Sequence, residues 1–241
     1  MHYNSYTKLT RDIKEICQQK NFDCFEVGRV GKNKQYPLLR VVIEPPEFSK
    51  TLLILSGVHS GTEPAPVTAV VEFLREYEDD CPVKLIMFPC LNPYAVSEGT
   101  RKNWENKDLN RSRNYYFQPE QTLCLLHSYG QSIDAVISLH EDSRISGKCC
   151  YGYGFNRQYK SFYQGLLGAM GQHTKVFQKE KLDGLTVEDG IIWDRFDTSL
   201  EARFAEAGVS RCFCSETGRG NFQQRVNANV ALLKEATALV R

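Results

Sequence analysis

Residues 51–64 read TLLILSGVHSGTEP, an apolar run followed by a polar turn and a proline. The run at 51–56 is short and mainly apolar and ends in turn residues, which is typical of a buried strand. Beyond the proline, apolar side chains recur at helical spacing, so we expect a helix over residues 64–77. A buried strand, a loop and a helix in this order form the repeating unit of a parallel α/β sheet.

The alternation of strand and helix continues through the rest of the chain. We expect further strands at 38–44, 83–89, 135–139, 174–177 and 211–214, and further helices at 6–20, 121–130, 159–173, 200–207 and 222–240. No linker or internal repeat divides the 241 residues, a length that suits one domain. The sequence therefore predicts an α/β fold over residues 1–241, a single-domain three-layer α/β/α sandwich around a mixed, mainly parallel twisted sheet. Residues 1–37 contribute an N-terminal helix and strand of unclear match.

Composition and charge argue against several classes of protein. Hydrophobic residues make up 41% of the chain and charged residues 24%, which is ordinary for a folded protein. The net charge is +1 and no basic stripe is present, which argues against a nucleic-acid partner. No apolar stretch approaches the ~18 residues of a membrane span. The nine cysteines include no C-x-x-C pair and the N-terminus is polar, so we expect reduced core thiols in a cytoplasmic protein without a signal peptide.

Two potential metal ligands flank the turn after the quoted strand. His59 lies in the loop at the carboxyl end of the strand, where open α/β sheets bind ligands, and Glu63 directly precedes Pro64 at the helix entrance. The two side chains can converge on one ion, since zinc accepts both imidazole nitrogen and carboxylate oxygen. Taken alone, the pair also fits a polar loop histidine and a glutamate that complements a helix N-terminus.

A third potential ligand, His140, directly follows the apolar strand expected at 135–139. Its position is again in the ligand zone of an α/β sheet, although a histidine at a sheet edge can also be purely structural. A catalytic zinc site needs three protein ligands and one open position. His59, Glu63 and His140 together would supply those ligands.

The polar region at 97–113 has little periodicity and exceeds the length of an ordinary connection, which is typical of a functional loop. It contains Arg101 and Arg111. Because a guanidinium matches a carboxylate with two parallel hydrogen bonds, these arginines suit an anionic substrate group. A solvated charged loop without a binding role would have a similar composition.

These patches, in this order, resemble the zinc carboxypeptidase family, the A/B-type metallocarboxypeptidases, and its relatives in the aspartoacylase and succinylglutamate desuccinylase group. The resemblance covers roughly residues 51–230 and implies the zinc carboxypeptidase-like fold, with His59, Glu63 and His140 holding one Zn²⁺ per chain. The family usually has two residues between the first histidine and the glutamate, whereas this chain has three. We expect Gly61 to absorb the extra residue as a bulge, because glycine tolerates unusual backbone angles.

The resemblance also implies roles for four residues of the polar loop. Asn110 and Arg111 would bind the terminal carboxylate of the substrate. Arg101 would polarise the scissile carbonyl and stabilise the oxyanion of the transition state. Asp108 would accept a hydrogen bond from His59, which fixes the tautomer and orientation of a ligand.

Glu216 is the candidate catalytic base on the same resemblance. It lies in a Glu-Thr dipeptide after the strand expected at 211–214, with Arg225 and Val226 downstream, as in the late motif of the family. Its role would be to take a proton from metal-activated water and pass it to the departing amine. The family often places a tyrosine over the substrate, but no motif selects among Tyr151, Tyr153, Tyr159 and Tyr163.

The resemblance therefore implies a zinc-dependent hydrolase that cleaves an amide bond next to a substrate carboxylate. We favour a metallocarboxypeptidase that acts on peptides, with cell-wall peptide fragments as one candidate substrate. The alternative is an N-acyl amino acid deacylase of the aspartoacylase or desuccinylase type, and a further alternative is a non-catalytic carboxylate-binding module. Each of these takes a peptide or N-acyl amino acid with a free carboxylate, without a nucleic-acid or membrane partner. The sequence leaves the oligomeric state open.

Overall fold

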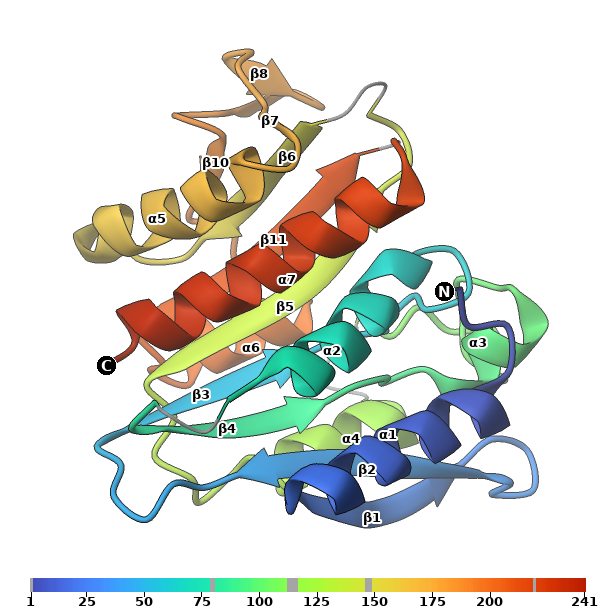
Figure 1. Cartoon of the computed structure of the whole chain (residues 1–241). Helices are drawn as coiled ribbons and strands as arrows, with labels where there is room; N and C mark the ends of the chain where they lie inside the picture. Colours follow the sequence, from blue (N-terminus) through green and yellow to red (C-terminus); the bar gives the residue numbers. More distant parts are fainter. Residues whose placement is uncertain (1, 79–80, 112–116, 146–148, 219) are drawn as a thin grey trace.

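The computed structural model describes residues 2–78, 81–111, 117–145, 149–218 and 220–241. Its main sheet is formed by β1 (Asp23–Val30), β2 (Tyr36–Ile43), β3 (Lys50–Leu55), β4 (Val83–Phe88), β5 (Ala135–Asp142), β6 (Cys149–Gly154), β7 (Lys175–Val176), β10 (Ile191–Trp193) and β11 (Arg211–Gly218). The strand order is β1-β2-β4-β3-β5-β11-β6-β10, with β7 beside β6 (Figure 1). A separate short hairpin consists of β8 (Lys181–Leu182) and β9 (Leu185–Thr186).

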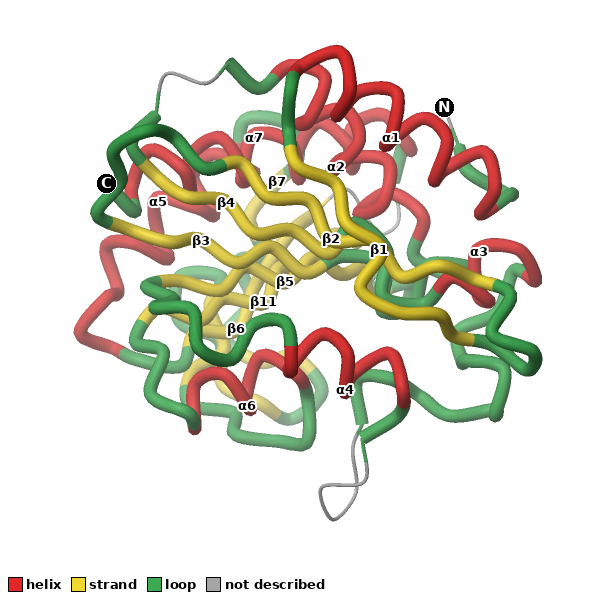
Figure 2. The backbone as a smooth tube through the Cα atoms, turned by 90° about the horizontal axis from the view of Figure 1, so that it is seen from below, coloured by secondary structure: helices red, strands yellow, loops and turns green. Residues whose placement is uncertain are grey.

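Helices cover both faces of the twisted sheet. They are α1 (Tyr6–Lys20), α2 (Pro64–Glu76), α3 (Pro93–Glu98), α4 (Pro119–Leu126), α5 (Lys160–Gly171), α6 (Leu200–Glu206) and α7 (Phe222–Leu239). One face packs against α1, α2, α5 and α7, and the other against α4 and α6 (Figure 2). The predicted three-layer α/β/α sandwich is therefore confirmed.

The central strands run parallel, and this direction determines where polar side chains gather. β4, β3, β5 and β11 pair in parallel, whereas β2 and β6 join them antiparallel at the two margins. The sheet is thus mixed and mainly parallel, as predicted. Because parallel strands end at the same edge, the loop after β3 and the last residues of β5 and β11 meet there.

The positions of most elements agree with the sequence pattern, but two strands are longer than expected. β5 continues to Asp142 and β11 to Gly218, so His140 and Glu216 lie within strands rather than after them. The backbone ladder persists because the two strands pair with each other over their full lengths. Periodicity missed these extensions because most of the added residues are polar, although strand pairing carries them into the buried edge of the sheet.

Other differences arise from short or capping segments. The short helix α3 is not among the expected elements; the Asn92 side chain caps it by accepting from the amide of Ala95, and Pro93 is its first residue. β6 and β10 were not predicted, because glycine alternates with tyrosine in β6 and β10 has only three residues. Glycine is required at 152, where a Cβ would lie 2.2 Å from the Phe213 ring.

Three further predictions concern the polar loop, the cysteines and membrane-spanning helices. Residues 99–111 of the expected polar loop contain no helix or strand, and the end of that loop, residues 112–113, lies outside the described residues. All nine cysteines are unpaired, and seven of them are buried. Within the described ranges, no helix is long and apolar enough to cross a membrane.

Candidate metal centre and active site

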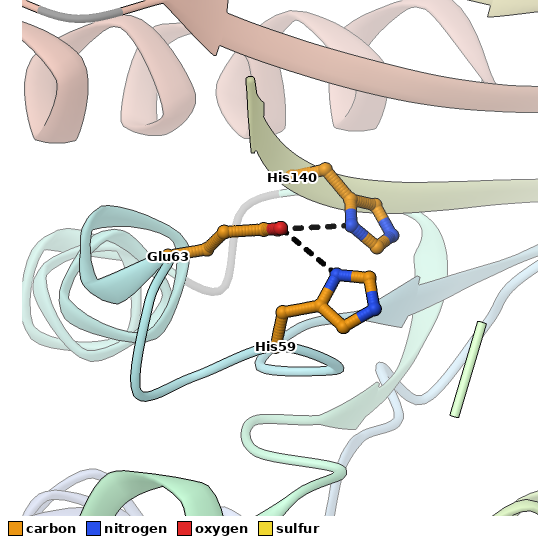
Figure 3. Close-up of side chains that lie close together, drawn as sticks. All are labelled: His59, Glu63 and His140. Atoms are coloured by element: carbon orange, nitrogen blue, oxygen red, sulfur yellow. Dashed lines mark hydrogen bonds and ion pairs between the residues drawn. The ribbon is translucent and has the colours of Figure 1, made fainter. Parts of the chain in front are cut away.

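Three side chains converge at the carboxyl edge of the parallel strands. His59 comes from the loop after β3, Glu63 from the N-cap of α2 and His140 from β5 (Figure 3). One ligand atom of each residue lies within 4.8 Å of those of the other two, and all three residues are buried. The structure therefore brings the three predicted ligands together, and the ion that they would hold stays a prediction.

A turn of helical dimensions brings His59 and Glu63 onto one side despite the extra residue between them. The amides of Thr62 and Glu63 both donate to the carbonyl of His59 at 2.9 Å. Residues four positions apart in such a turn share a face, so a spacing of three intervening residues suits a common ligand position. The expected bulge at Gly61 is replaced by this turn.

Gly61 is needed for close packing rather than for unusual backbone angles. Its φ lies outside the left-handed region, but a Cβ at this position would lie 2.2 Å from the carbonyl oxygen of Ala95 and 2.4 Å from the amide nitrogen of Thr100. The turn after β3 is therefore pressed directly against the backbone that leads from α3 into the polar loop. This contact positions the turn that carries both candidate ligands.

Each histidine presents Nδ1 to Glu63. His59 Nδ1 lies 2.9 Å from Glu63 Oε1, and His140 Nδ1 lies 3.1 Å from Glu63 Oε2. The first contact lacks hydrogen-bond geometry, so the buried His59 Nδ1 has no hydrogen-bond partner among the described residues. Ligand atoms around a tetrahedral zinc are roughly 3.3 Å apart. Two imidazole nitrogens and a carboxylate at this spacing fit a zinc ion with one open coordination position.

The outer ring nitrogens of the two histidines contact carboxylates. His59 Nε2 lies 2.7 Å from Asp108 Oδ1, the contact that the family resemblance implied. His140 Nε2 lies 3.0 Å from Oε1 of Glu201, a residue of α6. Sequence reasoning missed Glu201, because a glutamate in the first turn of a helix is ordinarily an exposed residue that complements the helix dipole. The sequence around Glu201 contains no motif that would identify it as a partner of His140.

The protonation of this cluster reflects dense pairing of buried groups. Burial opposes ionisation of Glu63, but the hydrogen bond from His140 and the adjacent His59 ring outweigh it and hold the pKa of Glu63 well below its ordinary value. Burial likewise lowers the pKa of His140, but its contacts with Glu201 and Glu63 prevail and raise that pKa well above normal. The carboxylates therefore favour a positive charge at the position between the rings, which a metal cation would satisfy.

Glu216 is the neighbour of His140 in the parallel pairing of β11 with β5. Its Oε2 is buried and has no hydrogen-bond partner among the described residues. Burial, together with the nearby carboxylates of Glu63, Asp142 and Glu201, raises the pKa of Glu216 to about 8 against the opposing effect of His140. A carboxyl group with a raised pKa beside a candidate metal position is suited to proton transfer.

The arginines of the polar loop lie at the same cavity and are already paired. Arg101 Nη1 donates to Glu63 Oε1 at 2.7 Å and Nε to Asp108 Oδ2 at 3.2 Å. Arg111 Nη1 donates to the carbonyl of Asn110 at 2.5 Å, and the Asn110 side chain accepts from the Leu200 amide at 3.2 Å. The loop is thus attached to the start of α6.

The three candidate ligands, Glu216, Glu201 and the side chains of Arg101, Asn110 and Arg111 line one cavity of about 560 Å³, whereas Asp108 lies behind its wall. Of the four candidate tyrosines, Tyr153 lines it, whereas Tyr163 is buried in the core. Tyr151 is also buried and donates to Asp142 Oδ2 at 2.9 Å. Tyr153 accepts a hydrogen bond from Arg195, a cavity residue that sequence reasoning did not identify. Only the tertiary structure shows that Tyr153 is the one at the cavity, because no local motif distinguishes the four tyrosines.

No protein-family model and no curated protein sequence matches the chain. Among solved structures, a proposed metallopeptidase from Shewanella denitrificans gives a TM-score of 0.86 at 28% identity, over 98% of this chain and 91% of that one. A second, from Shewanella amazonensis, gives 0.87 at 22% identity, over 98% and 94%. A metallo-carboxypeptidase from Burkholderia cenocepacia gives 0.73 at 15% identity, over 95% and 67%.

The likenesses at 22% and 15% identity establish the shared fold alone. The sheet order and both helical layers lie within the matched region, since almost the whole chain is covered. The structural neighbours of this chain are metallopeptidases and metallo-carboxypeptidases, so the resemblance predicted from its motifs is confirmed.

Proposed function

We propose that the chain is a zinc-dependent metallocarboxypeptidase that hydrolyses a peptide bond next to a free carboxylate. Its structural neighbours support a metallopeptidase-like hydrolase. The observation that carries the finer assignment is one cavity that contains the His59, Glu63 and His140 donor atoms, the buried carboxyl of Glu216 and the guanidinium of Arg111. These are the groups that such a reaction requires.

A zinc ion held by the three donors would supply a Lewis acid that activates water and polarises a carbonyl group. The protein contributes the geometry for this ion. Asp108 and Glu201 fix the outer nitrogens of the two imidazole rings, and Glu63 faces both inner nitrogens. Ligands oriented in this way lose little freedom when the ion binds.

Glu216 is the general base of the proposed reaction. Its carboxylate takes a proton from the attacking water, and the resulting carboxylic acid returns that proton to the departing amine. Burial raises the pKa of Glu216, so this carboxyl group can accept and release a proton nearer to neutral pH than an ordinary glutamate can. Deprotonation is favoured when a cation is nearby, because opposite charge lowers the pKa of a carboxyl group.

The arginines bind the charged parts of the substrate. Arg111 and Asn110 hold the terminal carboxylate, for which the guanidinium fork provides two parallel donors. Arg101 stabilises the oxyanion of the transition state. Its Nη1 donates to Glu63 Oε1 in this structure and would become available to the substrate if that oxygen served as a metal ligand, while Nε keeps its contact with Asp108.

The proposal is tested by metal analysis and by parallel assays of substrate classes. Purified protein is expected to contain about one equivalent of zinc, as a single three-ligand site requires. It should release the last residue from peptides of a C-terminal library, and Glu216→Gln should remove that activity. Glu78→Gln, a change at an exposed position, is the matched control.

Two results would contradict the proposal in different ways. Turnover of N-acyl amino acids without release of peptide C-terminal residues would instead assign the chain as a deacylase. Binding of carboxylate ligands to protein that takes up no zinc would support the non-catalytic binding module.

A further inference from the structure

His140 belongs to two overlapping groups of potential metal ligands. The first is His59, Glu63 and His140, and the second is His140, Glu201 and Cys214. Ligand atoms of each group lie within 4.8 Å of one another, and all the residues are buried. The two groups share one imidazole ring, so the contacts of its nitrogens determine which group can receive an ion.

The nitrogens of His140 have different partners. Nδ1 faces Glu63, whereas Nε2 lies 3.0 Å from Glu201 Oε1 and 3.1 Å from Ser138 Oγ. A neutral imidazole has one N–H donor and one lone pair, and only the lone pair can bind a metal. A carboxylate accepts hydrogen bonds but donates none, and carboxylates face both ring nitrogens, Glu63 at Nδ1 and Glu201 at Nε2. An ion held by His59 and Glu63 would take the Nδ1 lone pair, and Glu201 would then keep the single ring proton on Nε2.

Glu201 is well placed to hold this tautomer, because its own position is fixed. It lies in the first turn of α6 and its side chain is 1% exposed. The Ser199 side chain caps this helix, and the Leu200 amide donates to Asn110 Oδ1. Both contacts fix the start of α6 against the cavity. The Glu201 carboxylate is therefore held at a fixed position beside His140 of β5.

We propose that Glu201 is a positioning residue that holds the Nε2 proton of His140 and so directs the metal to the His59–Glu63–His140 group. Its carboxylate binds no ion itself, and Cys214 stays unligated. This inference rests on the proposed function, because it concerns the same metal centre. We expect Glu201 to affect zinc affinity more strongly than Asp108 does, because the Asp108 side chain is 24% exposed and also accepts a hydrogen bond from Arg101.

Zinc affinity of the metal-free protein tests the first part of the inference. Loss of such an outer carboxylate typically weakens metal binding by about 10- to 100-fold. Glu201→Gln is expected to show this loss and Asp108→Asn a smaller one, whereas Glu78→Gln should match the unaltered protein. Glu201→Asp keeps the charge but withdraws it by one methylene, so its affinity should fall between. Thermal unfolding of each metal-free variant shows whether it is folded.

Cobalt substitution tests the second part, since a cysteine ligand produces a thiolate-to-cobalt charge-transfer band in the ultraviolet. The cobalt form of the unaltered protein should lack this band, and Cys214→Ser should bind zinc as the unaltered protein does. A band that disappears in Cys214→Ser would overturn the inference. Equal zinc affinities for folded Glu201→Gln, Glu201→Asp and the unaltered protein would overturn it as well. Failure of the unaltered protein to bind any zinc would instead refute the proposed function itself.

Discussion

The cavity has one wall built from strands, which carries His140 and Glu216, and one built from a loop, which carries Arg101 and Arg111. The His140 side chain is 3% exposed, whereas those of Arg101 and Arg111 are 46% and 45% exposed. Strand register fixes the first pair through backbone hydrogen bonds. The second pair reaches the cavity through long side chains held by ion pairs and carbonyl contacts.

This difference separates chemistry from recognition. Changes in the strand-built wall should alter metal binding or the chemical step, because strand pairing fixes these side chains at the candidate metal centre. Changes at Arg111 in the loop-built wall should mainly alter substrate affinity, since an exposed guanidinium can exchange one carboxylate partner for another. Changes at Arg101 should also alter the chemical step, because this residue faces the oxyanion in the proposed reaction. Five predictions test this comparison.

The largest effect is expected for Glu216→Gln. Loss of the general base should lower kcat by about 10²- to 10⁴-fold, with zinc affinity almost unchanged. The metal-free variant should also be more stable by up to about 3 kcal/mol at pH 7, because the folded state no longer buries an ionisable carboxyl with a raised pKa. Steady-state kinetics and denaturant unfolding measure the two effects. A kcat reduced less than about tenfold would remove Glu216 from the role of base.

Arg111→Met should reduce kcat/KM by about 10²-fold, because a charge-assisted bidentate contact with the substrate carboxylate is lost. The loss should appear mainly in KM, and zinc affinity should stay the same. Arg111→Lys should recover part of the activity, since lysine keeps the charge without the planar fork. An amidated peptide, which lacks the carboxylate, is the matched substrate control. Equal loss on both substrates would contradict carboxylate recognition by Arg111.

Gly61→Ala should destabilise the protein by about 2 kcal/mol or more, because the new methyl group would overlap the backbone of the segment after α3. The turn carrying His59 and Glu63 should shift as a result, so zinc affinity should fall together with stability. Gly168→Ala, where no atom lies within 4 Å of the added Cβ, is the matched control. Unchanged stability of Gly61→Ala would show that this contact is less tight than the structure indicates.

The smallest effect concerns pH. Activity requires ionised Glu216, whose pKa burial raises to about 8 in the metal-free protein, so kcat/KM should fall as pH decreases through the pKa of this group. Because a bound cation lowers that pKa, the acid limb should lie between the ordinary value of 4.5 and about 8. The slope should approach tenfold per pH unit. A profile that stays flat from about pH 4 to 8 would contradict control by Glu216.

The ionisation of Glu216 should also change the free energy of unfolding, in the direction opposite to its effect on activity. The folded metal-free protein binds the Glu216 proton more tightly than the unfolded chain does. Its free energy of unfolding should therefore decrease as pH rises between the unfolded and folded pKa values. Glu216→Gln should remove this decrease. Unfolding curves at several pH values, compared between the two proteins, would measure it.

The layered α/β fold and the location of the candidate site follow from the sequence pattern and the family resemblance. β3 and β5 are continuous apolar runs, the composition expected of strands that are buried on both faces of a parallel sheet. Parallel strands end at the same edge of such a sheet. His59 and Glu63 follow β3 closely in the chain, and His140 and Glu216 lie near the carboxyl ends of β5 and β11. Their convergence could therefore be expected from topology and from the family resemblance.

The orientation of the side chains in the site depends on contacts between elements that are distant in the chain. Glu201 is 61 positions from His140, and their contact depends on how α6 packs against the sheet, which no local pattern encodes. The close approach of Gly61 to residues 95 and 100, and the choice of Tyr153 among four tyrosines, likewise depend on distant segments. Local interactions set the period of each element, whereas side-chain partners across elements are fixed only when burial brings the elements together.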